Sequence, residues 1–199
     1  MAVDVARFGD DETVVCFRQG TDARSIPWRT WRGADTVQSA KRIADLIGEY
    51  KPDAVVIESI GPGQGVIDTL RSWSYKVLEV HPGAPSARKE YLNVRAELWD
   101  RGREWIAMRG CLPPMDGDLF KQLTSIRYVV AGNSESVLQM EAKKDMKKRG
   151  LSSPDRADAL MISFAHNIAR RDARTSTGRP AGGSTRQAVV DYDELEMAA

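Results

Sequence analysis

Short β-rich apolar runs alternate with longer stretches of helical periodicity along this chain. Runs bounded by Gly, Pro and Asp predict strands at 2–7, 13–19, 25–32, 53–59 and 76–82. Apolar positions repeating every three or four residues predict helices at 34–51, 66–73, 95–110, 117–126 and from about 154 onward. A further pair of short strands at 127–140 is expected to form a hairpin turning at "AGNS".

The order of these elements predicts the fold class. The first three strands are joined by short links, which favours antiparallel pairing. Residues 53–59 form a continuous apolar run typical of a strand buried on both faces. Helices separate the later strands, which implies parallel strands joined by right-handed crossovers. We therefore expect an α/β fold with a mixed sheet, flanking helices and an added hairpin.

Length and composition indicate one domain. The chain has 199 residues, of which 42% are hydrophobic, enough for one buried core but too few for two ordinary domains. We expect the domain at 1–170 and a disordered tail at 171–199, where Gly, Ser, Thr and Arg dominate. A predicted strand begins directly after Met1, so we also expect the chain to be a piece of a longer protein.

Nothing in the sequence indicates a membrane or secreted protein. No apolar run reaches the roughly 18 residues that a bilayer span needs, and the start lacks a secretory signal pattern. The two cysteines, Cys16 and Cys111, have neither metal-site nor disulfide-scaffold spacing. We expect a soluble intracellular protein in a reducing compartment.

The net charge of +1 conceals a segregation of charge. Lysines and arginines concentrate at 143–149 and again at 170–174, whereas acids gather at the ends of apolar segments. A basic surface beside an acidic cleft suits a polyanionic substrate handled with metal. Solvated helix faces are the alternative interpretation of the same runs.

Four acids are candidates for the chemistry of this chain. Asp4 interrupts the first strand, although Asp is disfavoured in strands, and Glu58 closes the buried strand, where α/β sheets place ligands. In the last helix we expect Ser153 as N-cap and Pro154 as first residue, so that Asp155 complements the helix dipole.

Asp158 has no such local reason, because it lies on the margin of the apolar stripe of the last helix. A carboxylate there is costly unless it is paired or ligated, and two acids three residues apart repel each other. If Asp4, Glu58, Asp155 and Asp158 converge, they form an oxygen-only cage suited to Mg²⁺ or Mn²⁺. Two such ions would support phosphodiester hydrolysis. Solvent exposure remains the alternative for Asp4 and Glu58.

Three motifs in this order, "VDVARFGDD", "VVIESIGPG" and "GLSSPDRADALMISFA", resemble the nuclease domain of the large terminase subunit of tailed bacteriophages. The resemblance implies a ribonuclease H-like fold close to the RuvC resolvases. It implies that Asp4, Glu58, Asp155 and Asp158 are catalytic metal ligands for two Mg²⁺ or Mn²⁺ ions, with Asp10 as an additional acid beside them. It also implies that the hairpin lies near the DNA path.

The resemblance further implies an endonuclease that cuts concatemeric double-stranded DNA with little sequence specificity during viral DNA packaging. Expected partners are the ATPase domain of the full-length subunit, the small terminase subunit and the portal protein, in the cytoplasm of the infected bacterium. The sequence has no G-x-x-x-x-G-K-[ST] loop, so we expect no ATP site in this chain.

Basic residues are the candidates for contacts with DNA. Lys143 and Lys144, between the hairpin and the last helix, are the first candidates for phosphate contacts, followed by Arg88 and Lys89. Such contacts position DNA without reading its sequence.

Other functions remain open at this point. A RuvC-like junction resolvase would share the fold and the acids. An actin-like ATP-binding module would need Gly and Ser or Thr after the first aspartate, where "DVARFGDD" offers mainly acids. A non-catalytic docking domain would need no metal.

Overall fold

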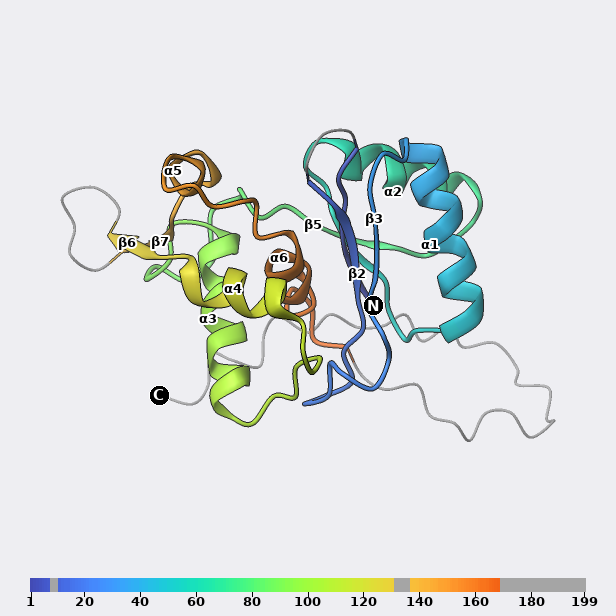
Figure 1. The fold of residues 1–199 in the computed structure, drawn as a ribbon. Helices are drawn as coiled ribbons and strands as arrows, with labels where there is room; N and C mark the ends of the chain where they lie inside the picture. The colour runs from blue at the N-terminus through green and yellow to red at the C-terminus, as the bar shows by residue number, and fades with distance from the viewer. Residues whose placement is uncertain (8–10, 131–136, 169–199) are drawn as a thin grey trace.

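A five-stranded mixed sheet runs through the centre of the structure (Figure 1). The computed structural model describes residues 1–7, 11–130 and 137–168. The strands of the sheet are β1 (Ala2–Asp4), β2 (Thr13–Cys16), β3 (Arg29–Trp31), β4 (Val56–Glu58) and β5 (Leu78–Val80). Their spatial order is β3-β2-β1-β4-β5. The first three strands pair antiparallel, whereas β4 runs parallel to β1 and to β5, which confirms the predicted mixed sheet.

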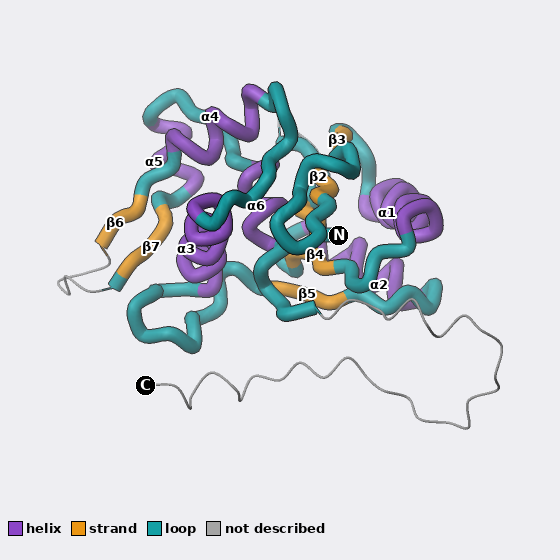
Figure 2. The backbone as a smooth tube through the Cα atoms, turned by 90° about the horizontal axis from the view of Figure 1, so that it is seen from below, coloured by secondary structure: helices purple, strands orange, loops and turns teal. Residues whose placement is uncertain are grey.

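Helices cover both faces of this sheet (Figures 1 and 2). They are α1 (Thr36–Tyr50), α2 (Pro62–Ser72), α3 (Val94–Ala107), α4 (Gly117–Ser125), α5 (Lys143–Lys148) and α6 (Asp155–Ile162). Successive strand residues point to opposite faces, so Val3 and Ile57 pack with α1 and α2. Ala2 and Val56 pack on the other side with α6. Helices α3 and α4 pack against α6 in turn. β4 is therefore buried on both faces, as its apolar run predicts.

The predicted hairpin forms a separate two-stranded sheet. Its strands β6 (Tyr128–Val130) and β7 (Leu138–Met140) pair antiparallel. β7 lies against α3, and α5 follows it with the basic run. The predicted turn at 131–134 and the predicted tail at 171–199 lie outside the described residues. None of the helices described here has the length and apolar character needed to cross a membrane.

α2 begins earlier than predicted, at Pro62 rather than at residue 66. Its second residue, Gly63, packs against the end of β4, where a Cβ atom would lie 1.8 Å from the carbonyl oxygen of Glu58. Only glycine permits this approach of helix to strand. The segment "GPGQG" therefore forms the first turn of α2. It packs this turn directly against the end of β4, which carries Glu58.

The start of α6 also differs from the prediction. Pro154 is the N-cap, so the prediction of Ser153 as N-cap was wrong by one residue. Pro154 has no side chain that can accept a hydrogen bond. The acceptor is instead Gln122 Oε1 of α4, which binds the backbone amides of Arg156 and Ala157 at 2.9 and 3.1 Å. A tertiary contact thus satisfies the free amide groups that a local cap would otherwise bind.

Candidate active site

Two of the predicted acids end adjacent parallel strands at one edge of the sheet. β1 and β4 pair with Val3 beside Ile57, so Asp4 and Glu58, the next residue in each strand, emerge side by side. Asp4 is buried and Glu58 is half-buried. Glu58 lies close enough to Asp4 for its negative charge to help raise the pKa of Asp4.

α6 brings the other two acids to the same edge. The helix packs across β1 and β2, and Asp155 and Asp158 are each only 6% exposed. One oxygen of Asp155 accepts a hydrogen bond from the backbone amide of Glu12 at 2.9 Å, in the β1–β2 connection. Both acids lie close enough to Asp4 for their negative charge to raise its pKa. Three segments distant in sequence therefore bring the four predicted acids together.

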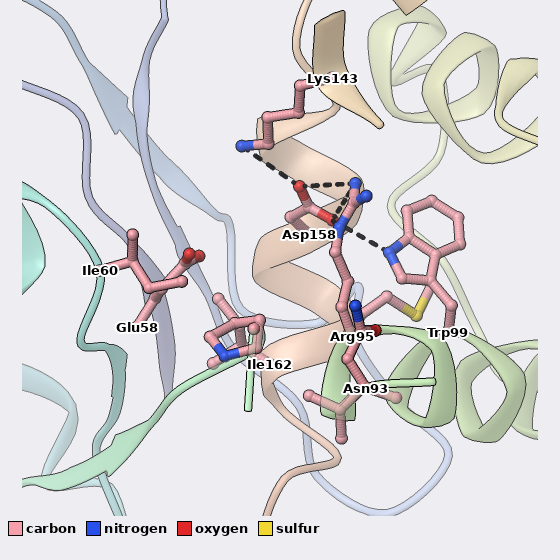
Figure 3. Close-up of a pocket in the computed structure, with 12 residues that line it drawn as sticks. Glu58, Ile60, Asn93, Arg95, Trp99, Lys143, Asp158 and Ile162 are labelled. Atoms are coloured by element: carbon pink, nitrogen blue, oxygen red, sulfur yellow. Dashed lines mark hydrogen bonds and ion pairs between the residues drawn. The ribbon is translucent and has the colours of Figure 1, made fainter. Parts of the chain in front are cut away.

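Asp158 is held by donors from α3 and α5 (Figure 3). Arg95 binds its carboxylate through Nε and Nη2 at 3.1–3.2 Å, and the indole nitrogen of Trp99 donates to Oδ1 at 3.0 Å. Lys143 Nζ lies 3.4 Å from Oδ2 of Asp158 and 4.0 Å from Oδ1 of Asp155. Asp158 is thus paired with two cations.

Burial and mutual repulsion change the proton affinities of this cluster. Burial, reinforced by the neighbouring carboxylates, raises the pKa of Asp4 well above its usual value and raises those of Glu58 and Asp155. Burial would also raise the pKa of Asp158, but its two cations lower it. For Lys143 burial favours a lower pKa, yet the four carboxylates raise it. With all four carboxyl groups ionised, the site would carry more negative charge than Arg95 and Lys143 neutralise.

The donor chemistry fits a hard divalent cation. All four side chains offer carboxylate oxygens, and Oδ2 of Asp4 is buried with no hydrogen-bond partner. Within the described ranges, no three Asp, Glu, His or Cys side chains are grouped closely enough to hold a metal ion as they stand. Asp158 is turned onto Arg95 and Trp99. Asp10 lies outside the described residues.

A recess of about 310 Å³ opens beside the acids (Figure 3). Its lining combines polar side chains, Glu58, Asn93, Arg95, Lys143 and Asp158, with apolar ones that include Trp99 and Ile162. Glu58 and Asp158 therefore face a recess between α3, α6 and the loop after β5 rather than a flat surface.

The candidate DNA-contacting residues are divided by the structure. Lys143 and its neighbour Lys144 are both exposed at the start of α5, but Lys143 directs its ammonium group toward the acid cluster. Arg88 and Lys89 are exposed in the loop between β5 and α3, and Arg88 is paired with Glu90. Lys143 thus differs from the other three, because it contacts the acids directly.

Two residues at the site were missed by the sequence analysis. Arg95 and Trp99 stand one helical turn apart on α3, and their spacing predicts only a shared helix face. Nothing in the sequence connects this face with Asp158, which lies 63 positions beyond Arg95 along the chain.

Solved structures of phage terminase nuclease domains share this fold. The nuclease domain of the large terminase subunit gp2 of bacterial virus Sf6, in a variant with manganese and beta-thujaplicinol, is 20% identical; the match has a TM-score of 0.67 and covers 85% of this chain and 90% of that one. The large terminase nuclease of thermophilic phage G20c is 15% identical, with a TM-score of 0.57 over 82% and 79% of the two chains. A magnesium-bound G20c structure matches similarly, at 15% identity, a TM-score of 0.58 and 82% and 78% coverage. No protein-family model and no curated protein matches the sequence. The chain therefore has the ribonuclease H-like fold of phage large terminase nuclease domains.

Proposed function

We propose that this chain is the nuclease domain of a phage large terminase subunit, an endonuclease that cuts double-stranded DNA during packaging. The observation that carries the proposal is the meeting of Asp4, Glu58, Asp155 and Asp158 at one edge of the sheet, in a fold shared with nuclease domains. Excess buried negative charge has no structural benefit by itself, because it lowers stability. A cation-dependent reaction accounts for it.

The four acids are the proposed ligands for two Mg²⁺ or Mn²⁺ ions, with Asp10 as a further acid beside them. Related structures contain manganese, magnesium or cobalt, which supports a divalent cation for this chain. When bound, such ions supply positive charge to phosphate oxygens and increase the acidity of water. The buried and unpartnered Oδ2 of Asp4 is the ligand atom most available as the structure stands.

The side chains around the acids have separate roles in this proposal. The raised pKa of Lys143 keeps its ammonium group protonated, so that it can donate to a phosphate oxygen once a metal neutralises Asp158. Lys144, Arg88 and Lys89 are exposed and would hold the DNA backbone further out. Because these contacts address phosphate, cleavage should show little sequence preference and binding should weaken with salt.

In the full-length subunit, this domain would act with an ATPase domain, the small terminase subunit and the portal protein. That setting places it in the cytoplasm of the infected bacterium. The polar segment 171–199 is proposed as a disordered tail after a nuclease domain at 1–170, on composition alone.

The test is cleavage of supercoiled plasmid with Mg²⁺, Mn²⁺ or a chelator. Wild type should nick and linearise the plasmid only with metal, and Asp158→Asn and Glu58→Gln should lose at least about 100-fold in rate. Asp68→Asn is the matched control, because Asp68 is an exposed acid on α2, on the opposite face of the sheet. Wild-type rates in the two cluster variants would contradict the proposal. A marked preference for four-way junctions would favour a resolvase instead.

A further inference from the structure

One guanidinium group joins two parts of the candidate site. Arg95 binds the carboxylate of Asp158 through Nε and Nη2, while its Nη1 donates to the backbone carbonyl of Glu141 at 3.2 Å. Glu141 stands two residues before Lys143, between β7 and α5. The same side chain therefore contacts a proposed metal ligand and the segment that presents the lysine.

The contacts around Arg95 leave Asp158 little freedom. Its Oδ1 accepts from Arg95 Nε, Arg95 Nη2 and Trp99 Nε1, so this oxygen has no capacity left for a strong additional partner. Its other oxygen, Oδ2, also accepts from Arg95 Nη2, at 3.2 Å, and lies 3.4 Å from Lys143 Nζ. The geometry of α3 thus decides which oxygen of Asp158 is directed toward the acid cluster.

The segment before Lys143 is fixed from a second side as well. Arg149 pairs with the buried carboxylate of Glu141 and donates through Nη2 to the carbonyl of Ser125 at 2.8 Å. With Arg95 on its backbone and Arg149 on its side chain, Glu141 is held to α3, α4 and α5 together. Lys143 consequently extends from a segment that Arg95 and Arg149 hold in place at Glu141.

We propose that Arg95, assisted by Trp99, is a positioning residue of the nuclease site: it orients Asp158 for metal binding and fixes the segment that carries Lys143. This inference rests on the proposed function. Arg95 is suited to the role because its planar fork binds a carboxylate in two places and still reaches a third acceptor. A lysine at position 95 keeps the charge but cannot make the same three contacts.

Arg95→Lys is the main test, Trp99→Phe is a second variant that removes only the indole donor, and Arg101→Lys is the matched control. Arg101 lies on the same helix and also joins an acid, Glu97, to a backbone carbonyl, that of Phe164, but away from the acid cluster. For each protein we would measure Mn²⁺ binding by titration calorimetry, plasmid cleavage at saturating Mn²⁺, and thermal unfolding without metal.

Arg95→Lys is expected to lose about 10- to 100-fold in Mn²⁺ affinity or in cleavage rate, the range typical of groups that orient a metal ligand. Trp99→Phe should show a smaller loss in the same quantities. The KM for DNA should stay unchanged, because the polar contacts of Arg95 are made to Asp158 and to the carbonyl of Glu141. Arg101→Lys should alter only the unfolding temperature.

Several results would overturn the inference. Wild-type Mn²⁺ affinity and cleavage in folded Arg95→Lys would reduce Arg95 to a structural role, even if its unfolding temperature fell. If Arg95→Lys does not fold, wild-type behaviour of Trp99→Phe has the same consequence. Failure of the wild-type protein to bind Mn²⁺ or cut DNA is a different outcome, since it removes the proposed function and this inference with it.

Discussion

The ammonium nitrogen of Lys143 lies 3.4 Å from Oδ2 of Asp158, inside the acid cluster rather than on the outer basic surface. The contact joins the first residue of α5 to the first turn of α6. It places a cation where four carboxylates would otherwise repel one another. In the metal-free protein, Lys143 therefore performs part of the neutralisation that a divalent ion would provide.

Replacing Lys143 should separate its proposed role in cleavage from its role in neutralising the acids. We expect Lys143→Ala to lose cleavage and to lower the free energy of unfolding of the metal-free protein by roughly 1 kcal/mol, since the side chain is partly exposed. Mn²⁺ should raise the unfolding temperature of the variant more than that of wild type, because the acids have lost their internal cation. Lys144→Ala is the control, with an exposed side chain on the same helix. Equal metal shifts in all three proteins would contradict this account.

Asp4→Asn should stabilise the metal-free protein while abolishing cleavage. Burial raises the pKa of Asp4 well above its usual value of 3.8, so the folded protein binds this proton more tightly than the unfolded chain does. That contribution to stability is fully present below the unfolded pKa and is lost as pH rises through the folded pKa. Asparagine has no proton to lose, so the advantage of the variant should grow with pH.

The measurement is urea unfolding with chelator at pH 4, 5.5 and 7 for wild type and Asp4→Asn. By pH 7 the variant should be more stable by at least about 1 kcal/mol, the equivalent of one pKa unit. A variant that is less stable at every pH would mean that Asp4 is a structural acid with a partner in the fold.

Gly63→Ala should damage both stability and activity. The added Cβ would lie 1.8 Å from the carbonyl oxygen of Glu58, so α2 or the end of β4 must move. We expect a loss of about 1–3 kcal/mol in the free energy of unfolding, as for other overpacked sites, together with slower cleavage because Glu58 shifts.

Gly48→Ala is the matched control for Gly63. Gly48 lies within α1, and a Cβ there meets nothing within 4 Å. This variant should gain about 0.5–1 kcal/mol from helix propensity and should cut DNA like wild type. A Gly63→Ala protein as stable as Gly48→Ala would show that the helix start adapts at no cost.

The two cysteines should differ in reactivity. Cys16 is fully buried in β2, and burial raises the pKa of its thiol to about 12, so it is almost never ionised at neutral pH. Cys111 is partly exposed. Iodoacetamide at pH 8 should therefore label Cys111 in the native protein and reach Cys16 only after denaturation, as peptide mass spectrometry would detect. Equal labelling of both in native protein would indicate local opening of β2.

Much of the fold could be predicted from local patterns. The apolar runs located all five sheet strands, and the continuous run at 53–59 identified β4 as buried on both faces, because hydrophobic periodicity reports directly on burial. The first residues of two helices could not be predicted in this way. α2 starts at Pro62 because Gly63 fits against β4, and α6 is capped by Gln122 from α4. Both starts depend on contacts between elements, which local periodicity does not record.

For the candidate site, local patterns were enough to predict the four candidate acids and an oxygen-only ligand set, because a carboxylate inside an apolar stripe or strand is costly. The contacts that neutralise these acids could not be predicted locally, because they come from tertiary packing. It turned Lys143 inward and brought Arg95 and Trp99 against Asp158 across 63 and 59 positions of sequence. Such pairings depend on how α3, α5 and α6 pack on the sheet, and electrostatic energy depends on distance in space rather than separation along the chain.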